Sequence, residues 1–128
     1  PNLPDNPSHR HYVQSLYHLT RTLDPQRPVI GNDGWESSAT DIVGIHDYDA
    51  EPQRIRARYH SDDVVPRLFR KERPGGRVLV LEGHANLDHP IVLSEFGGIA
   101  CSSEQRTWGY SRCDTGEALR QRYTELLQ

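Results

Sequence analysis

The sequence predicts an α/β fold in which short parallel strands alternate with helices. Three short runs rich in β-branched residues, at positions 29–31, 42–45 and 91–93, are separated by segments whose apolar residues recur at helical spacing. This order implies right-handed βαβ units and a parallel sheet. In folds of this kind ligands bind at the carboxyl ends of the strands, so the polar residues that follow each run are the first candidates for a site.

Three regions outside the predicted strands should be helical. Residues 9–23 carry one apolar face, with Ser8 as the N-cap, and residues 51–73 form two helices. A final helix should open at a capping box formed by Asp114 and Glu117, after a long loop. We expect the apolar faces of the first and last helices to point inward: Tyr12, Leu16, Leu19 and Leu23 in the first, and Leu119, Tyr123 and Leu126 in the last.

The run at 91–93 leads into the most informative residue of the chain, Glu95. The run opens after Pro90 and closes at Gly97-Gly98, which is typical of a short strand buried on both faces. An unpaired carboxylate is costly to bury, so packing explains Glu95 poorly. A strand-end site explains it better, although from position alone a solvated acid fits equally well.

Polar and aromatic residues also follow the other two predicted strands. Residues 32–34 have the composition of a turn, while the Trp35 ring is of the kind that lines ligand pockets. His46, Asp47 and Tyr48 follow the second strand, where the histidine and acids could in principle ligate a metal. No matching histidine or cysteine pair lies at ligand spacing nearby, so neither a metal nor another cofactor is expected.

Composition limits the classes of function. The chain has 128 residues, enough for one domain, and a net charge of −3, which gives no basic footprint for nucleic acid. No apolar run approaches the ~18 residues of a membrane span. The hydrophobic fraction of 34% is low for a self-sufficient domain, so the core is expected to rely on further sequence.

Two cysteines, Cys101 and Cys113, are too few for a disulfide scaffold. We expect free thiols in a reducing compartment and a cytoplasmic location. An alternative is a cysteine hydrolase in which Cys101 begins a helix that lowers its pKa, but no histidine is specifically paired with it.

Four segments, taken in order, resemble one enzyme family. Ser-Glu-Phe-Gly-Gly at 94–98 follows an apolar strand. Arg-Pro-Val-Ile-Gly-Asn-Asp-Gly-Trp at 27–35 and Asp-Ile-Val-Gly-Ile-His-Asp-Tyr at 41–48 precede it, and Trp-Gly-Tyr-Ser at 108–111 comes after it. The ordered set covers most of the chain and resembles glycoside hydrolase family 2, the family of β-galactosidases, β-glucuronidases and β-mannosidases.

The resemblance implies that residues 1–128 are a single segment, the C-terminal part of a catalytic (β/α)8 TIM barrel, roughly strands 5 to 7 with their helices. It implies a retaining mechanism on a carbohydrate substrate, a β-glycoside, with Glu95 as the nucleophile and Tyr48 as the residue that orients it. It also implies a set of residues that line the sugar pocket: Asn32, Asp33, Trp35, His46 and Trp108.

One departure from the family pattern concerns the acid/base residue. The family's acid/base glutamate lies in an Asn-Glu pair, and no such pair occurs in this chain. We therefore expect a segment of a longer enzyme that is inactive alone, with exposed strand edges that favour homo-oligomers. The alternative function is a non-catalytic carbohydrate-binding module that contacts sugar through Trp35 and Trp108.

Overall fold

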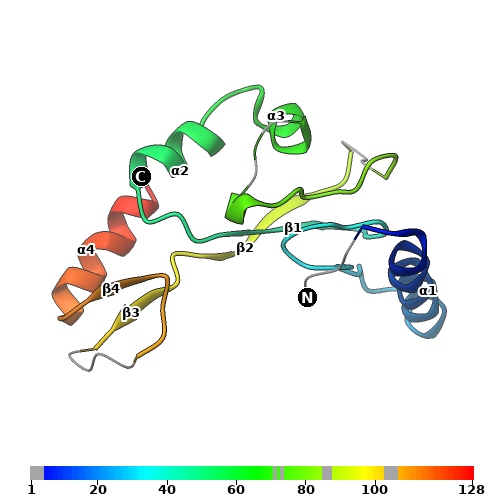
Figure 1. Ribbon diagram of the computed structural model, residues 1–128, viewed down its shortest axis with the longest axis horizontal. Helices are drawn as coiled ribbons and strands as arrows, with labels where there is room; N and C mark the ends of the chain where they lie inside the picture. The colour runs from blue at the N-terminus through cyan, green and yellow to red at the C-terminus, as the bar shows by residue number, and fades with distance from the viewer. Residues whose placement is uncertain (1–4, 71, 73, 85–87, 103–106) are drawn as a thin grey trace.

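The computed structural model describes residues 5–70, 72, 74–84, 88–102 and 107–128. In this part, the chain forms a small α/β arrangement of four α-helices and two separate two-stranded parallel sheets (Figure 1). The first sheet pairs β1 (Val43–Asp47) with β2 (Ile91–Phe96), and the second pairs β3 (Ile99–Cys101) with β4 (Ser111–Cys113). Figure 1 shows the first sheet in the middle, α1 at one end, and the second sheet with α4 at the other.

The hydrophobic core lies between the first sheet and α3 (Val64–Arg70). β1 is the buried strand, and its Val43 and Ile45 are almost completely inaccessible. β2 alternates between half-buried and exposed residues, so the expectation that this strand is buried on both faces is wrong. Leu68 and Leu79 complete the buried cluster, and partly buried apolar residues surround it: Tyr59, Val64, Phe69, Val80, Ile91 and Leu93.

The predicted partial TIM barrel is wrong. The described residues form two small sheets, each of two strands, and residues 29–31 are not a strand. Their backbone groups find other partners, because Val29 N donates to Asp41 Oδ2 at 2.8 Å and Gly31 N to Thr40 Oγ1 at 3.1 Å. Nearby side chains thus satisfy the donors that a neighbouring strand would have bound.

The first helix, α1 (Pro7–Leu23), confirms the predicted helix but begins earlier. Asn6 is the N-cap instead of Ser8, and its side chain accepts a hydrogen bond from His9 N at 3.0 Å. The expected burial of the apolar face is wrong, since four of its members are largely exposed: Tyr12, Leu16, Leu19 and Leu23. Helical periodicity identifies which face is apolar, but it does not supply what covers that face.

The remaining helices follow the predicted segments. α2 (Pro52–Tyr59) and α3 are separate helices, as expected, and a short 3₁₀ turn, η1 (Pro74–Gly76), follows them. α4 (Gly116–Leu126) is capped by Thr115, not by Asp114. Its inward face is confirmed in part: Leu126 is buried, whereas Tyr123 is half exposed and stacks on Phe96.

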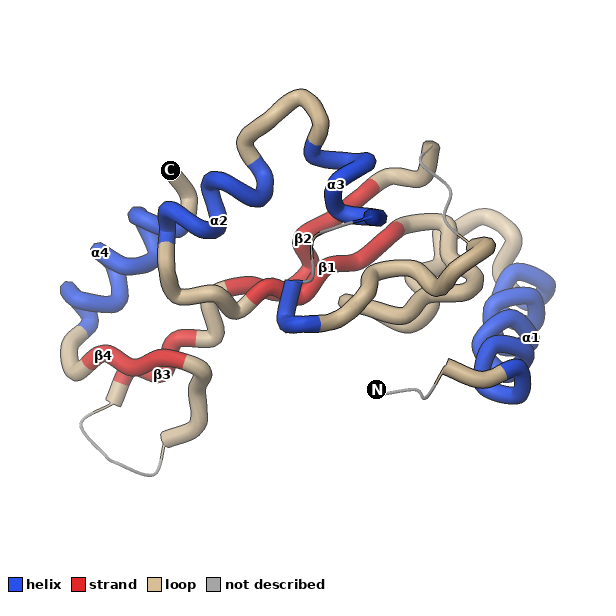
Figure 2. The backbone as a smooth tube through the Cα atoms, turned by 45° about the horizontal axis from the view of Figure 1, so that its top comes forward, coloured by secondary structure: helices blue, strands red, loops and turns tan. Residues whose placement is uncertain are grey.

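The segment expected to be a long loop, residues 101–113, begins at the last residue of β3 and ends in β4. Figure 2 shows these two strands beside α4, apart from the β1–β2 sheet. Cys101 is the last residue of β3. The helix start that the cysteine hydrolase alternative requires would continue through Ser103, which lies outside the described residues. Among the described residues, no helix is long and apolar enough to span a bilayer.

Candidate functional site

The centre of the candidate site is a bulge in the β1–β2 ladder. Ile45 lies opposite Leu93, but the next pair is His46 with Glu95, so β2 carries one extra residue, Ser94. A bulge re-aims the side chains around it, and bulges are over-represented beside active sites. This one brings Glu95 next to the side chains at the carboxyl end of β1.

The Tyr48 hydroxyl donates a hydrogen bond to Oε2 of Glu95. Burial of the phenol, together with this bond to a carboxylate, raises the pKa of Tyr48 well above its ordinary value. Tyr48 therefore remains a donor throughout the neutral pH range and orients the carboxylate. The Glu95 side chain is 53% exposed, so a ligand can reach it.

His46 lies between two carboxylates. Its Nε2 atom is 3.2 Å from Oδ2 of Asp33 and 3.7 Å from Oε1 of Glu95, and its Nδ1 atom is 3.5 Å from the Tyr48 hydroxyl. The imidazole is therefore close to both acids and to the tyrosine, although its Nε2 atom is buried and makes no hydrogen bond to the described residues in this arrangement. In its protonated form, His46 would pair with both carboxylates.

Asp33 reaches this cluster by crossing the backbone of β1 at Gly44. A Cβ atom at position 44 would lie 1.7 Å from Oδ1 of Asp33, so the carboxylate occupies the space that a side chain there would fill. Ser94 Oγ donates to the same oxygen at 2.8 Å. Sequence reasoning missed both Gly44 and Ser94, because their role comes from contacts between segments far apart in the chain.

Aromatic rings form a wall beside the cluster. Trp35 meets the His46 ring edge-on with centroids 4.9 Å apart, and Tyr110 stacks on Tyr48 at 4.0 Å. Trp108 contacts Tyr110 at 5.2 Å and is 76% exposed. Tyr110 was not among the predicted site residues, although the Trp-Gly-Tyr sequence around it was a usable signal.

Five of the seven predicted site residues come together in this way: Asp33, Trp35, His46, Tyr48 and Glu95. Trp108 reaches the cluster through Tyr110. Asn32 is buried, and its amide donates to the Trp35 carbonyl at 2.8 Å, so it supports the turn that presents Trp35.

Asp47 belongs to a different network from its neighbours in sequence. It is 1% exposed, and its carboxylate accepts hydrogen bonds from Arg58 and from the Tyr59 hydroxyl, which anchors α2 to the end of β1. Burial and the Asp47 charge raise the pKa of Tyr59. Among the described residues, no group of three histidine, cysteine or acidic side chains is placed to hold a metal ion.

A cavity of about 580 Å³ opens beside Tyr48, within the size range of small-ligand pockets. Its walls combine the aromatic rings of Trp35, Tyr48 and Tyr110 with the paired charges of Asp49 and Arg54, whose closest atoms are 2.7 Å apart. The cavity beside Tyr48 thus combines aromatic ring faces with a pair of opposite charges.

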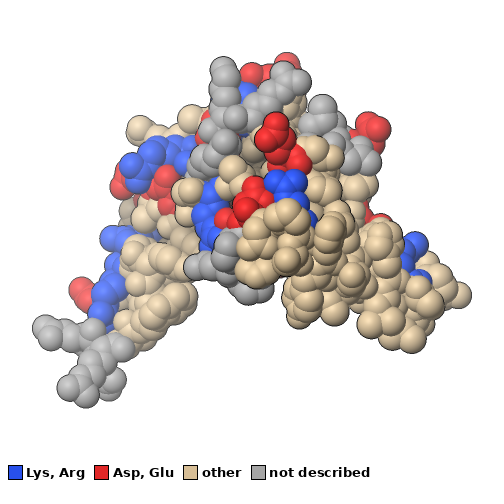
Figure 3. Space-filling model, turned by 45° about the vertical axis from the view of Figure 1, so that its right-hand side comes forward, with Lys and Arg blue, Asp and Glu red and all other residues tan. Residues whose placement is uncertain are grey.

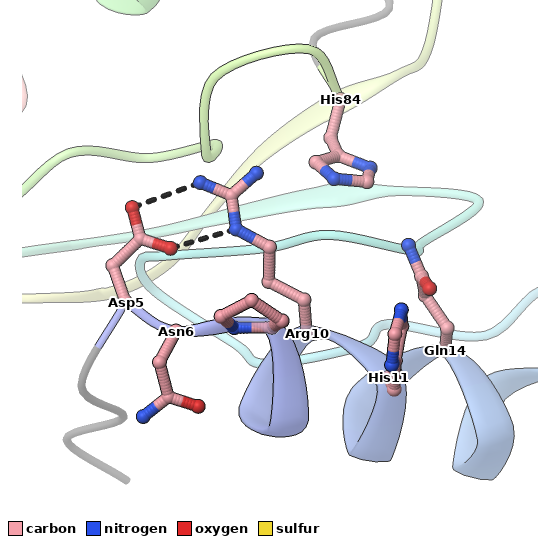
Figure 4. A pocket seen from close by; sticks show the side chains of 7 residues that line it. Asp5, Asn6, Arg10, His11, Gln14 and His84 are labelled. Carbon is pink, nitrogen blue, oxygen red and sulfur yellow. Dashed lines mark hydrogen bonds and ion pairs between the residues drawn. The ribbon is translucent and has the colours of Figure 1, made fainter.

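Oppositely charged side chains also pair elsewhere in the described part of the molecule. On the central part of the face in Figure 3, acidic and basic side chains lie next to one another. At the start of α1, Figure 4 shows a second pocket, lined by Arg10, His11 and His84, in which two hydrogen bonds join Arg10 to Asp5. Because that arginine is already paired, this pocket is a weaker ligand site than the Glu95 cluster.

Comparison with known proteins found no match: no family model, no curated protein and no solved structure matches this chain.

Proposed function

We propose that Glu95 is the nucleophile of a retaining β-glycosidase that hydrolyses terminal β-glycosidic bonds, of the β-galactosidase or β-glucuronidase type. The single observation that carries the proposal is the hydrogen bond from the Tyr48 hydroxyl to the Glu95 carboxylate. The resemblance of residues 94–98 to the nucleophile strand of glycoside hydrolase family 2 supports the same role.

In this proposal Glu95 attacks the anomeric carbon and the bond to the leaving group breaks, which leaves a glycosyl-enzyme ester that water later hydrolyses. Tyr48 holds the carboxylate for the attack. Asp33 and His46 lie beside Glu95 and bind hydroxyl groups of the same sugar. The Trp35 ring meets His46 edge-on and carries the Arg77 guanidinium 4.9 Å from its centroid, so it contributes to the wall of the site.

The second carboxyl group of a retaining enzyme protonates the leaving group. This chain has no Asn-Glu pair to supply it. We therefore expect negligible turnover of unactivated β-glycosides by these 128 residues alone. Transfer to Glu95 from a substrate whose leaving group departs without a proton is still expected.

A second candidate is a non-catalytic carbohydrate-binding module. The exposed Trp108 and the stacked pair of Tyr48 and Tyr110 favour it, since sugars bind to such aromatic surfaces without any chemistry. Under this alternative, sugar binding would not depend on the nucleophilicity of Glu95.

The deciding experiment uses dinitrophenyl 2-deoxy-2-fluoro-β-glycosides of galactose, glucose, mannose and glucuronic acid. The fluorine slows hydrolysis of the ester, and the activated phenolate leaves without an acid catalyst. Mass spectrometry of the digested protein should find one added sugar on the peptide that contains Glu95. Glu95→Gln should abolish the label, whereas the matched control Glu125→Gln, an exposed acid on α4, should not.

If none of the four sugars labels Glu95 in the folded chain, the nucleophile assignment is wrong. Sugar titration followed by NMR then separates the two candidates. Chemical-shift changes at Trp108 and Tyr110 that persist in Glu95→Gln would support the binding module.

A further inference from the structure

The two cysteines, far apart in the sequence, are register partners in the second sheet. Cys101 ends β3 and Cys113 ends β4, and their Cα atoms are paired in the parallel ladder. Adjacent strands lie about 4.8 Å apart, which falls within the Cα separation of about 4.4–6.8 Å that disulfides span. Paired residues of a parallel ladder also point to the same face of the sheet.

The environments of the two thiols differ in a way that favours an ordered reaction. Cys101 is exposed, whereas Cys113 is buried, and its thiol donates to the Ala100 carbonyl at 3.6 Å. Burial and a hydrogen bond with the Cys101 side chain raise the pKa of Cys113. The strand register places the two cysteines next to each other, and because Cys101 is the exposed one a dissolved reagent reaches it first.

We propose that Cys101 and Cys113 form a reversible disulfide when the protein meets a low-molecular-weight disulfide such as oxidised glutathione. The Cys101 thiolate attacks one glutathione sulfur, which breaks the glutathione disulfide, releases one glutathione thiolate and leaves a mixed disulfide. The Cys113 thiolate then attacks Sγ of Cys101 and releases the second glutathione. Two protein thiols are oxidised, one glutathione disulfide is reduced to two thiols, and the two protein protons go to the released thiolates or to buffer.

This bond would close the loop that carries part of the aromatic wall. Trp108 and Tyr110 lie between the two cysteines, and Tyr110 stacks on Tyr48. A covalent tie at the base of the loop limits how far the Tyr110 ring can move away from Tyr48. Oxidation would thus make this wall of the site more rigid, whatever reaction the site performs.

The test treats the folded chain with oxidised glutathione, blocks remaining thiols with iodoacetamide, and measures the intact mass. The parent should lose two hydrogens, take up no iodoacetamide, and yield a tryptic species that joins the Cys101 and Cys113 peptides; dithiothreitol should reverse this. Cys113→Ser should stop at the mixed disulfide on Cys101, which should persist at least about tenfold longer than in the parent because the resolving thiol is gone. Amide hydrogen exchange at residues 107–112 should slow in the oxidised parent.

Three results would overturn the proposal. They are a parent protein that keeps one or two glutathiones, a disulfide between two chains, and an internal disulfide that forms in urea but not in buffer. These outcomes concern the parent chain alone, so a folding defect in Cys113→Ser would leave them decisive. They are also independent of the labelling of Glu95.

Discussion

The contact between Tyr48 and Glu95 predicts how the tyrosine titrates when the carboxylate is neutralised. Glu95→Gln keeps the size of the side chain and one acceptor oxygen but removes the negative charge. Burial is the largest cause of the raised pKa of Tyr48, followed by the hydrogen bond to Glu95 and by the charges of Glu95, Tyr110 and Asp33. Glu95→Gln removes only the part that comes from Glu95. We therefore expect the pKa of Tyr48 to fall in Glu95→Gln while remaining above its usual value of about 10.

The size of the fall follows from the exposure of Glu95. A hydrogen bond to a charged group contributes about 1.5–3 kcal/mol, and the lower end applies because this carboxylate is 53% exposed to solvent. One pKa unit corresponds to about 1.36 kcal/mol, so the pKa of Tyr48 should drop by about one unit.

The measurement is an NMR titration of the tyrosine ring carbons from pH 8 up to the alkaline limit of the folded state, with Glu125→Gln as the matched control. The control should leave the Tyr48 titration unchanged, because Glu125 lies on α4 and bonds to Gln121. Equal titration of Tyr48 in Glu95→Gln and in the parent would show that the hydroxyl does not bond to Glu95. The nucleophile proposal would then lose the observation that carries it.

Three further predictions concern stability, each measured by urea denaturation. Gly44→Ala should lower the free energy of unfolding by about 1–3 kcal/mol, because the new methyl group displaces the Asp33 carboxylate. The control Gly116→Ala, at an open helix position, should be neutral or stabilising. Equal effects of the two substitutions would show that Asp33 does not lie against Gly44. Asp47→Asn should cost about 3 kcal/mol by breaking the buried ion pair with α2, and a loss below about 1 kcal/mol would show that the pair is not formed. The pKa of Tyr59 is raised in the folded state, so the neutral phenol stabilises the fold fully below about pH 10, and this stabilisation is lost as the pH rises further. In Tyr59→Phe the free energy of unfolding should therefore fall less steeply above pH 10, by about 1.4 kcal/mol per pH unit. An unchanged slope would show that the pKa of Tyr59 is not raised.

The helices and the site acid could be predicted from the sequence because their signals are local. Spacing of apolar residues places α1, α2 and α4 within a few residues of their observed bounds, and Glu95 stands out as a charge directly after an apolar run. The same patterns predicted residues 29–31 as a strand. That prediction failed because side chains of residues 40 and 41 bind the backbone there, which composition does not reveal.

The amino-acid sequence by itself determined where the helices form, which residues can do chemistry, and that Tyr48 and Glu95 each follow an apolar run. The tertiary structure alone decided that the two meet, that Asp33 crosses Gly44, and that the cysteines are partners in one sheet. The physical reason is how far apart in the sequence the interacting residues lie. Helical periodicity and turn chemistry act over a few residues, whereas a bulge, a strand register or a close approach depends on segments up to about 60 residues apart, which only folding brings together.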